Sequence, residues 1–111
     1  MAGYRRDVFT VVGGAVARTF GPVTSPIRLR ELRVHVSAAP TTAGSFTVTL
    51  DSVDGAAYDL LLYTIDLSVA STVNLLVDDF DVLLFTGDAL VVAYANADGR
   101  TIGTQLIFSE A

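Results

Sequence analysis

Apolar and polar residues alternate along much of the chain, and this pattern predicts β-strands. The clearest example is residues 46–50, with the sequence Phe-Thr-Val-Thr-Leu. A period of two is typical of a strand with one face in a core and the other face nearer to solvent. No window combines the i, i+3, i+4, i+7 spacing of an amphipathic helix with capping residues, so we expect almost no helix.

Residues 85–101 are the most informative segment, because they place a strand between two turns. Thr86–Asp88 and Asn96–Gly99 supply the glycines and short polar side chains that turns need. Both faces of the intervening strand are apolar, so we expect both to be covered. One face should fill the core, and the other should contact another subunit or the N-terminal arm. These faces are, in that order, Leu90, Val92 and Tyr94, and Val91, Ala93 and Ala95.

Seven strands at roughly ten-residue spacing follow residue 26, and they predict an all-β fold, an antiparallel β-sandwich of the jelly-roll kind. Within Ile27–Val36 the parity of the apolar residues changes near Arg30 and Glu31, which indicates a β-bulge. The other six predicted strands are residues 46–50, 58–65, 72–77, 82–85, 90–95 and 101–108.

Residues 1–26 have a different character from this body. Val8–Val12 and Ala15–Phe20 read as two strands joined by Gly13–Gly14, a dipeptide that suits a hairpin turn. Two prolines in Gly21–Pro26 then prevent regular pairing. We therefore predict an N-terminal β-hairpin arm (1–26) that leaves a β-sandwich body (27–111).

The charges are divided unevenly along the chain, although the net charge is only −5. Residues 1–33 hold six arginines and two acids, a net charge of +4, whereas the remainder holds ten acids and one arginine, a net charge of −9. The basic part should dock on an acidic protein surface. The chain has no lysine, and its arginines are not clustered with exposed aromatic residues, so we expect no nucleic-acid binding.

The residues predicted to bind this partner lie in the arm and at the start of the first body strand. An equally open alternative is that the three body arginines are scattered surface residues, which contribute only ~0–1 kcal/mol each. The candidate residues are Arg5, Arg6, Phe9, Val11, Arg18, Phe20, Arg28, Arg30 and Arg33.

Hydrophobic residues make up 51% of the chain and its mean hydropathy is +0.54, which is high for a small domain. No apolar run approaches the ~20 residues of a membrane span, so we expect no membrane partner. The excess apolar surface is better explained by contacts between subunits. The candidate interface residues are Leu61, Tyr63, Leu76, Val91, Ala93 and Ala95.

The chain offers little catalytic chemistry, and we expect no enzyme. It has no cysteine, a single histidine (His35) that should face away from the core, and no Gly-x-Ser-x-Gly motif. Many of its aspartates sit at strand ends, where turns use them. We expect no cofactor. Calcium is the one metal with suitable oxygen ligands, at Asp78, Asp79 and Asp81 and at Asp51 and Asp54, but neither cluster matches an EF-hand loop.

Residues Val34–Ser52, Gly55–Asp59 and Gly87–Gly103 resemble small β-sandwich virion proteins of tailed bacteriophages. The resemblance covers about residues 27–108, and it consists of strand and turn residues without a catalytic motif. It implies a structural role, above all that of a capsid decoration (cement) protein. The implied partners are the major capsid protein and other copies of the chain in a homotrimer. The implied location is the capsid surface of the virion, after synthesis in the host cytoplasm. The alternative is a fibre, adaptor or head-tail module that recognises a partner protein or a surface glycan.

Overall fold

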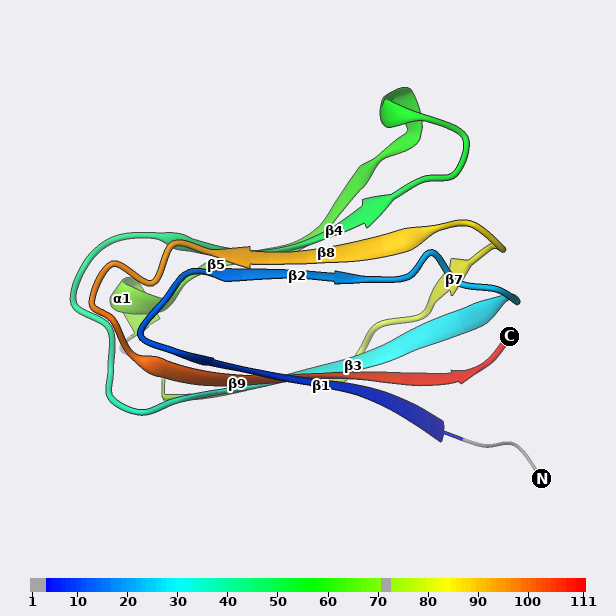
Figure 1. Ribbon diagram of the computed structural model, residues 1–111. Helices are drawn as coiled ribbons and strands as arrows, with labels where there is room; N and C mark the ends of the chain where they lie inside the picture. Colours follow the sequence, from blue (N-terminus) through cyan, green and yellow to red (C-terminus); the bar gives the residue numbers. More distant parts are fainter. Residues whose placement is uncertain (1–3, 71–72) are drawn as a thin grey trace.

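Two antiparallel β-sheets packed face to face form the protein, as a computed structural model that describes residues 4–70 and 73–111 shows (Figure 1). The all-β sandwich predicted from the alternation is therefore confirmed. Helix is limited to one short 3-10 turn and one short α-helix in the described residues. The elements are β1 (Tyr4–Val12), β2 (Val16–Phe20), β3 (Ile27–Val36), β4 (Ser45–Asp51), η1 (Ala56–Tyr58), β5 (Leu60–Asp66), α1 (Leu67–Ala70), β6 (Asn74–Val77), β7 (Val82–Leu84), β8 (Ala89–Tyr94) and β9 (Thr101–Glu110).

The first sheet has the strand order β1-β9-β3-β6, and β7 also pairs with β3; the second sheet has the order β2-β8-β4-β5. The inward side chains of both sheets meet in one core, with Phe46, Leu90 and Phe108 completely buried. Strand β8 is two-faced as predicted. Its Leu90, Val92 and Tyr94 are buried, while Val91 and Ala93 lie on the outer face.

The predicted β-bulge is also confirmed. The register between β3 and β9 shifts between Leu29 and Glu31, so that Leu29 and Leu32 both point into the core and are fully buried. The extra residue, Arg30, leaves two consecutive outward side chains, because a bulge places two residues opposite one. This shift puts Arg28 and Arg33 on the same outer face despite their opposite parity.

The predicted N-terminal hairpin arm is wrong for the described residues. β1 pairs with β9 along its whole length, and β2 pairs with β8 in the other sheet. The turn at Gly13–Gly14 carries the chain from one sheet to the other. The apolar side chains of Phe9, Val11 and Phe20 drive this arrangement, because each can be covered only by the core between the sheets.

Buried polar side chains hold the two ends of the sandwich. Asp88 accepts hydrogen bonds from the backbone N–H groups of Val53 (2.8 Å) and Phe85 (2.9 Å). Gly21 lies against this turn, and a Cβ there would come within 3.0 Å of the Asp88 carbonyl oxygen. At the other end the Asn96 amide donates to the carbonyl oxygens of Gly14 and Arg100, both at 2.8 Å. The turn roles inferred for residues 86–88 and 96–99 are thus confirmed.

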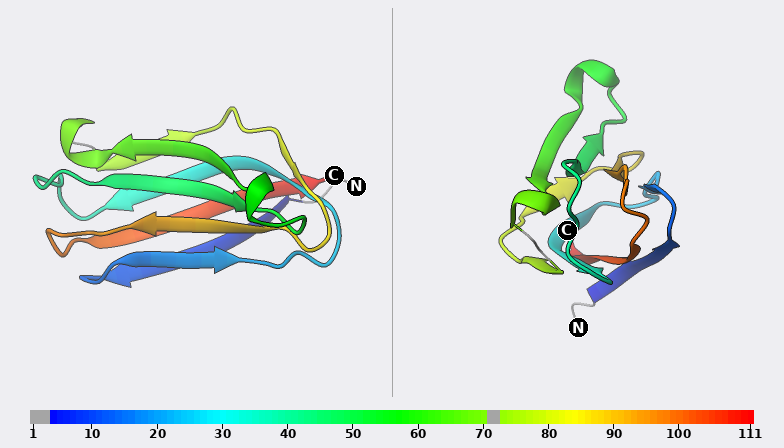
Figure 2. Two further views of the ribbon diagram at one scale, coloured as in Figure 1. Left: turned by 90° about the horizontal axis from the view of Figure 1, so that it is seen from above. Right: turned by 90° about the vertical axis from the view of Figure 1, so that its left-hand side faces the viewer.

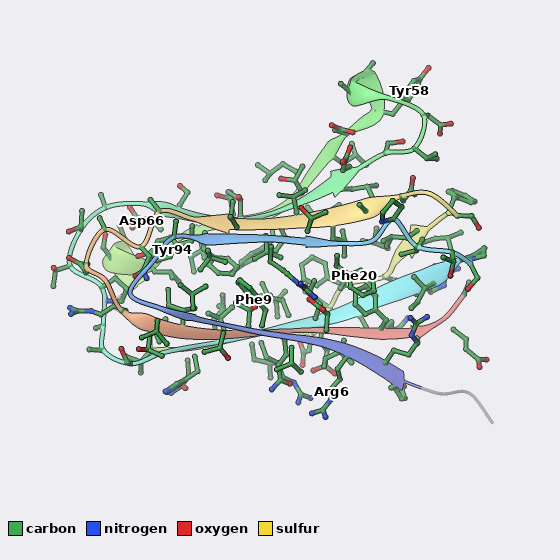
Figure 3. All side chains as sticks on the ribbon, in the orientation of Figure 1. Arg6, Phe9, Phe20, Tyr58, Asp66 and Tyr94 are labelled. Atoms are coloured by element: carbon green, nitrogen blue, oxygen red, sulfur yellow. The ribbon has the colours of Figure 1, made fainter. Side chains whose placement is uncertain are left out.

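The connection between β4 and β5 extends beyond the body of the sandwich (Figures 1 and 2). We call residues 51–61 the projection. The sequence predicts a strand from Tyr58, but Tyr58 lies in η1 at the tip of the projection, and β5 begins only at Leu60. Figure 3 places Tyr58 far from the labelled residues of the core.

Candidate functional site

The residues predicted to bind a partner separate into a buried group and an exposed group. Phe9, Val11 and Phe20 pack against the core, and the Phe20 ring stacks on Phe108 with 4.5 Å between centroids. Figure 3 shows Phe9 and Phe20 between the two layers. These three side chains stabilise the fold, so they are not available for an external partner.

Arg18 also points between the sheets, where it joins the two N-terminal strands. Its Nε donates to Asp7 Oδ2 at 3.0 Å, a second nitrogen bonds Asp7 Oδ1, and the guanidinium lies 5.5 Å from the Phe9 ring centroid. The hydrogen bond to the carboxylate raises the pKa of Arg18 above its ordinary value. Arg18 therefore fastens β2 to β1.

Four of the other arginines gather on the outer face of the first sheet. Arg6 on β1 is opposite Ile107 on β9, which is in turn opposite Glu31 beside the bulge in β3. Figure 3 shows Arg6 pointing away from the sandwich. We call this surface the arginine face; its cations are Arg6, Arg28, Arg30 and Arg33.

Nearby carboxylates neutralise part of the arginine face. Arg28 and Arg30 share Asp81, at 3.1 Å and 3.2 Å, and Arg33 pairs with Glu31 at 3.1 Å. These ion pairs are exposed, so each contributes little to stability. An arginine in such a pair can exchange its carboxylate for one on a partner protein. Arg5 is exposed at the strand end and lines a smaller hollow with Pro26.

An open groove of about 500 Å³ continues the arginine face towards the other end of the first sheet. Gly103 on β9 forms part of it, and a Cβ there would meet no atom of the described residues within 4 Å. The missing side chain leaves a depression between β1 and β3. The side chains around it include Val8 and Thr10 on β1, Arg33 and His35 on β3, Leu76 on β6, and Gln105 on β9.

Two polar groups in this groove are notable. His35 is exposed, as predicted, and its Nδ1 is 2.8 Å from Asn74 Oδ1. Gln105 Oε1 is buried and has no hydrogen-bond partner among the described residues. A buried acceptor of this kind favours a ligand or partner that brings a hydrogen-bond donor.

The predicted interface residues do not form one surface. Leu61 and Leu76 are each 59% exposed, on the projection and beside the groove respectively. Tyr63 instead packs edge-on against Phe80, with 6.2 Å between ring centroids. The other three lie on or beside the outer face of the second sheet, where their role in assembly stays a prediction: Val91, Ala93 and Ala95.

The sequence does not predict that the projection forms an exposed apolar and acidic surface. Four of its apolar side chains are between 55% and 63% exposed, and three aspartates accompany them. The available signal was the loss of alternation after the Asp51–Gly55 turn. The apolar residues are Val53, Tyr58, Leu60 and Leu61, and the aspartates are Asp51, Asp54 and Asp59.

Several aspartates at strand ends form hydrogen bonds within turns and loops, as the sequence predicts. Asp66 accepts hydrogen bonds from Ser68 and Gly44, and these lower the pKa of Asp66. Asp98 accepts four hydrogen bonds from Thr41 and Thr42, and these hold the pKa of Asp98 well below its ordinary value. Within residues 4–70 and 73–111, no three His, Cys, Asp or Glu side chains are grouped closely enough to hold a metal ion.

Among the described residues, no helix has the length and apolar character needed to cross a membrane. No protein-family model matches the chain, and no curated protein matches it either.

Proposed function

We propose that this protein is a non-enzymatic structural protein that binds an acidic protein surface through its arginine face. The observation that carries the proposal is the gathering of Arg6, Arg28, Arg30 and Arg33 on one exposed sheet face. Guanidinium groups form bidentate hydrogen bonds with carboxylates, so such a face suits an acidic partner.

The resemblance to phage virion proteins supplies the biological setting. We propose a capsid decoration protein whose partner is the major capsid protein and which assembles as a homotrimer on the capsid surface. The strand orders β1-β9-β3-β6 and β2-β8-β4-β5 support the narrower jelly-roll assignment, since the chain passes repeatedly between the two sheets. In this proposal the partner is bound by the arginine face, and not by an N-terminal arm as the sequence predicts.

Binding to capsids that lack the protein tests this proposal. Arg6→Gln with Arg33→Gln should weaken binding at least tenfold, because both changes remove cations from the arginine face. The double variant should also lose most of the salt dependence of binding, since exposed charges are screened by salt.

A matched control carries the same change in net charge on the opposite sheet. Thr19 and Thr64 are exposed on the second sheet, so Thr19→Glu with Thr64→Glu also makes the protein more negative by two charges. This control should bind capsids nearly as well as the wild type. Equal loss of binding in both double variants would show that net charge matters and that the arginine face has no special role.

A further inference from the structure

The projection and the groove are complementary surfaces on opposite sides of the same molecule. The projection leaves the second sheet and points away from the first sheet, as Figure 1 and the right-hand view of Figure 2 both show. The groove lies on the outer face of the first sheet, between β1 and β3. The projection therefore cannot reach the groove of its own chain.

Charge makes a second copy a suitable occupant of the groove. The chain has no arginine or lysine between Arg33 and Arg100, so the projection carries only the negative charges of Asp51, Asp54 and Asp59. Arg33 and His35 line the groove, with the rest of the arginine face beside them. Complementary potentials of this kind orient two surfaces and speed their encounter.

The apolar residues are complementary too. Tyr58, Leu60 and Leu61 on the projection are exposed, and Val8 and Leu76 beside the groove are exposed as well. Exposed apolar side chains grouped with charges are typical of interaction sites. The buried Gln105 Oε1 in the groove would also gain a donor from a docked segment.

Internal hydrogen bonds shape the projection before it meets a partner. Asp59 Oδ1 accepts from the Ser52 N–H at 2.8 Å, and the Tyr58 N–H donates to the Gly55 carbonyl oxygen at 3.0 Å. At its base, the Val53 N–H bonds the buried Asp88. A segment that is already ordered loses less entropy when it docks.

We propose that the projection of one molecule docks in the groove on the first sheet of a second copy. Two different patches then meet, so the contact is heterologous and repeats from copy to copy into a ring or an open chain. The trimer proposed above would be one such ring. The inference rests on the proposed function only in treating the protein as one that assembles, and its test needs no capsid.

Two variants remove the two surfaces separately. Gly103→Leu fills the groove, and it should fold normally because a Cβ at this position has open space. Tyr58→Ser with Leu61→Ser removes two exposed apolar side chains from the projection. Val69→Ser is the control, since Val69 is also exposed but lies in α1, outside both surfaces. Circular dichroism melts should show that all of them are folded.

Sedimentation velocity over a wide range of protein concentration gives the decisive result. Wild type and the Val69 control should sediment as multiples of the 11.7 kDa chain, while the groove variant and the projection variant should each be monomeric. When these two variants are mixed they should form a one-to-one dimer and nothing larger, because only one intact projection and one intact groove can meet. A contact between identical patches would not produce this result.

Three outcomes would overturn the proposal: a monomeric wild type, a groove variant that assembles like the wild type, or a mixture that stays monomeric. A monomeric wild type that still binds capsids through its arginine face would keep the proposed capsid binding and contradict only the contact between copies. If only capsid binding fails, the proposed contact between copies is not contradicted.

Discussion

Asp98 shows how single polar residues fasten this fold. Its Oδ2 accepts the backbone N–H groups of Thr41 (2.8 Å) and Thr42 (3.0 Å), and its Oδ1 accepts both threonine hydroxyl groups. These bonds favour the charged carboxylate, so the pKa of Asp98 is held well below its ordinary value of 3.8. One side chain thus ties the β3–β4 loop to the turn before β9.

The lowered pKa of Asp98 predicts a pH dependence of stability. The unfolded chain takes up the proton near pH 3.8 while the folded chain does not, so the stabilisation is present above that pH. It is lost as the pH falls through the depressed folded value. Asp98→Asn should therefore melt at a lower temperature than the wild type at pH 7, and the difference should narrow at pH 3. A difference that stays constant between these pH values would contradict this account.

Strand β8 has two apolar faces, and the two faces lie in different surroundings. Its inward side chains form part of the core, and Val92 is only 1% exposed. Its outward side chains lie among residues without charge, because Val91 is paired with Thr19 on β2 and Thr49 on β4. The two faces should therefore respond differently to the same substitution.

Substitution with aspartate separates the two faces of β8. Val92→Asp buries a charge without a partner and should cost about 4 kcal/mol or more of the free energy of unfolding. Val91→Asp should cost about 1 kcal/mol or less, since its carboxylate can reach water from the outer face. Urea denaturation of both variants measures the difference. Similar losses in the two variants would refute the two-faced description.

At the scale of the whole molecule, the N-terminal strands hold the sandwich closed along one side. β1 and β2 belong to different sheets, and they are joined by Arg18, Asp7 and the Gly13–Gly14 turn. They also cover Phe108 and other core residues at this side. Removing them would leave an unpaired strand at the edge of each sheet.

Deletion of residues 2–20 should therefore abolish folding instead of leaving a folded body. Full burial of a side chain of this size stabilises a fold by about 1.5–3 kcal/mol. Val16 is buried, and Phe9, Val11 and Phe20 are partly buried against the core, so the four together contribute several kcal/mol. Their sum is comparable with the roughly 5–15 kcal/mol net stability of a domain. The measurement is the circular dichroism spectrum and melting curve of the shortened protein. As a control, Asp7→Asn with Arg18→Gln keeps both strands, so it should stay folded and lose only about 1 kcal/mol. A shortened protein that melts cooperatively would support the original prediction that the N-terminal strands form an arm separate from the body.

The predictions that succeeded depend on local chemistry. Period-two alternation marks the strands, the change of parity in Ile27–Val36 marks the bulge, and Asp88 and Asn96 mark the turns. The hairpin prediction failed because Gly13–Gly14 permits a tight turn without deciding which strands pair. The projection was missed because the loss of alternation in residues 51–61 indicates irregular structure without showing that the segment extends beyond the body of the sandwich.

The sequence by itself determined the all-β class, the strand faces and the turn residues, since each follows from neighbours along the chain. Only the tertiary structure decided that Arg6 joins Arg33 on one face and that Gly103 opens a groove beside them. The physical reason is that strands pair where both sheets can bury their apolar faces against a common core. Surfaces built from strands distant in sequence exist only after that pairing is made.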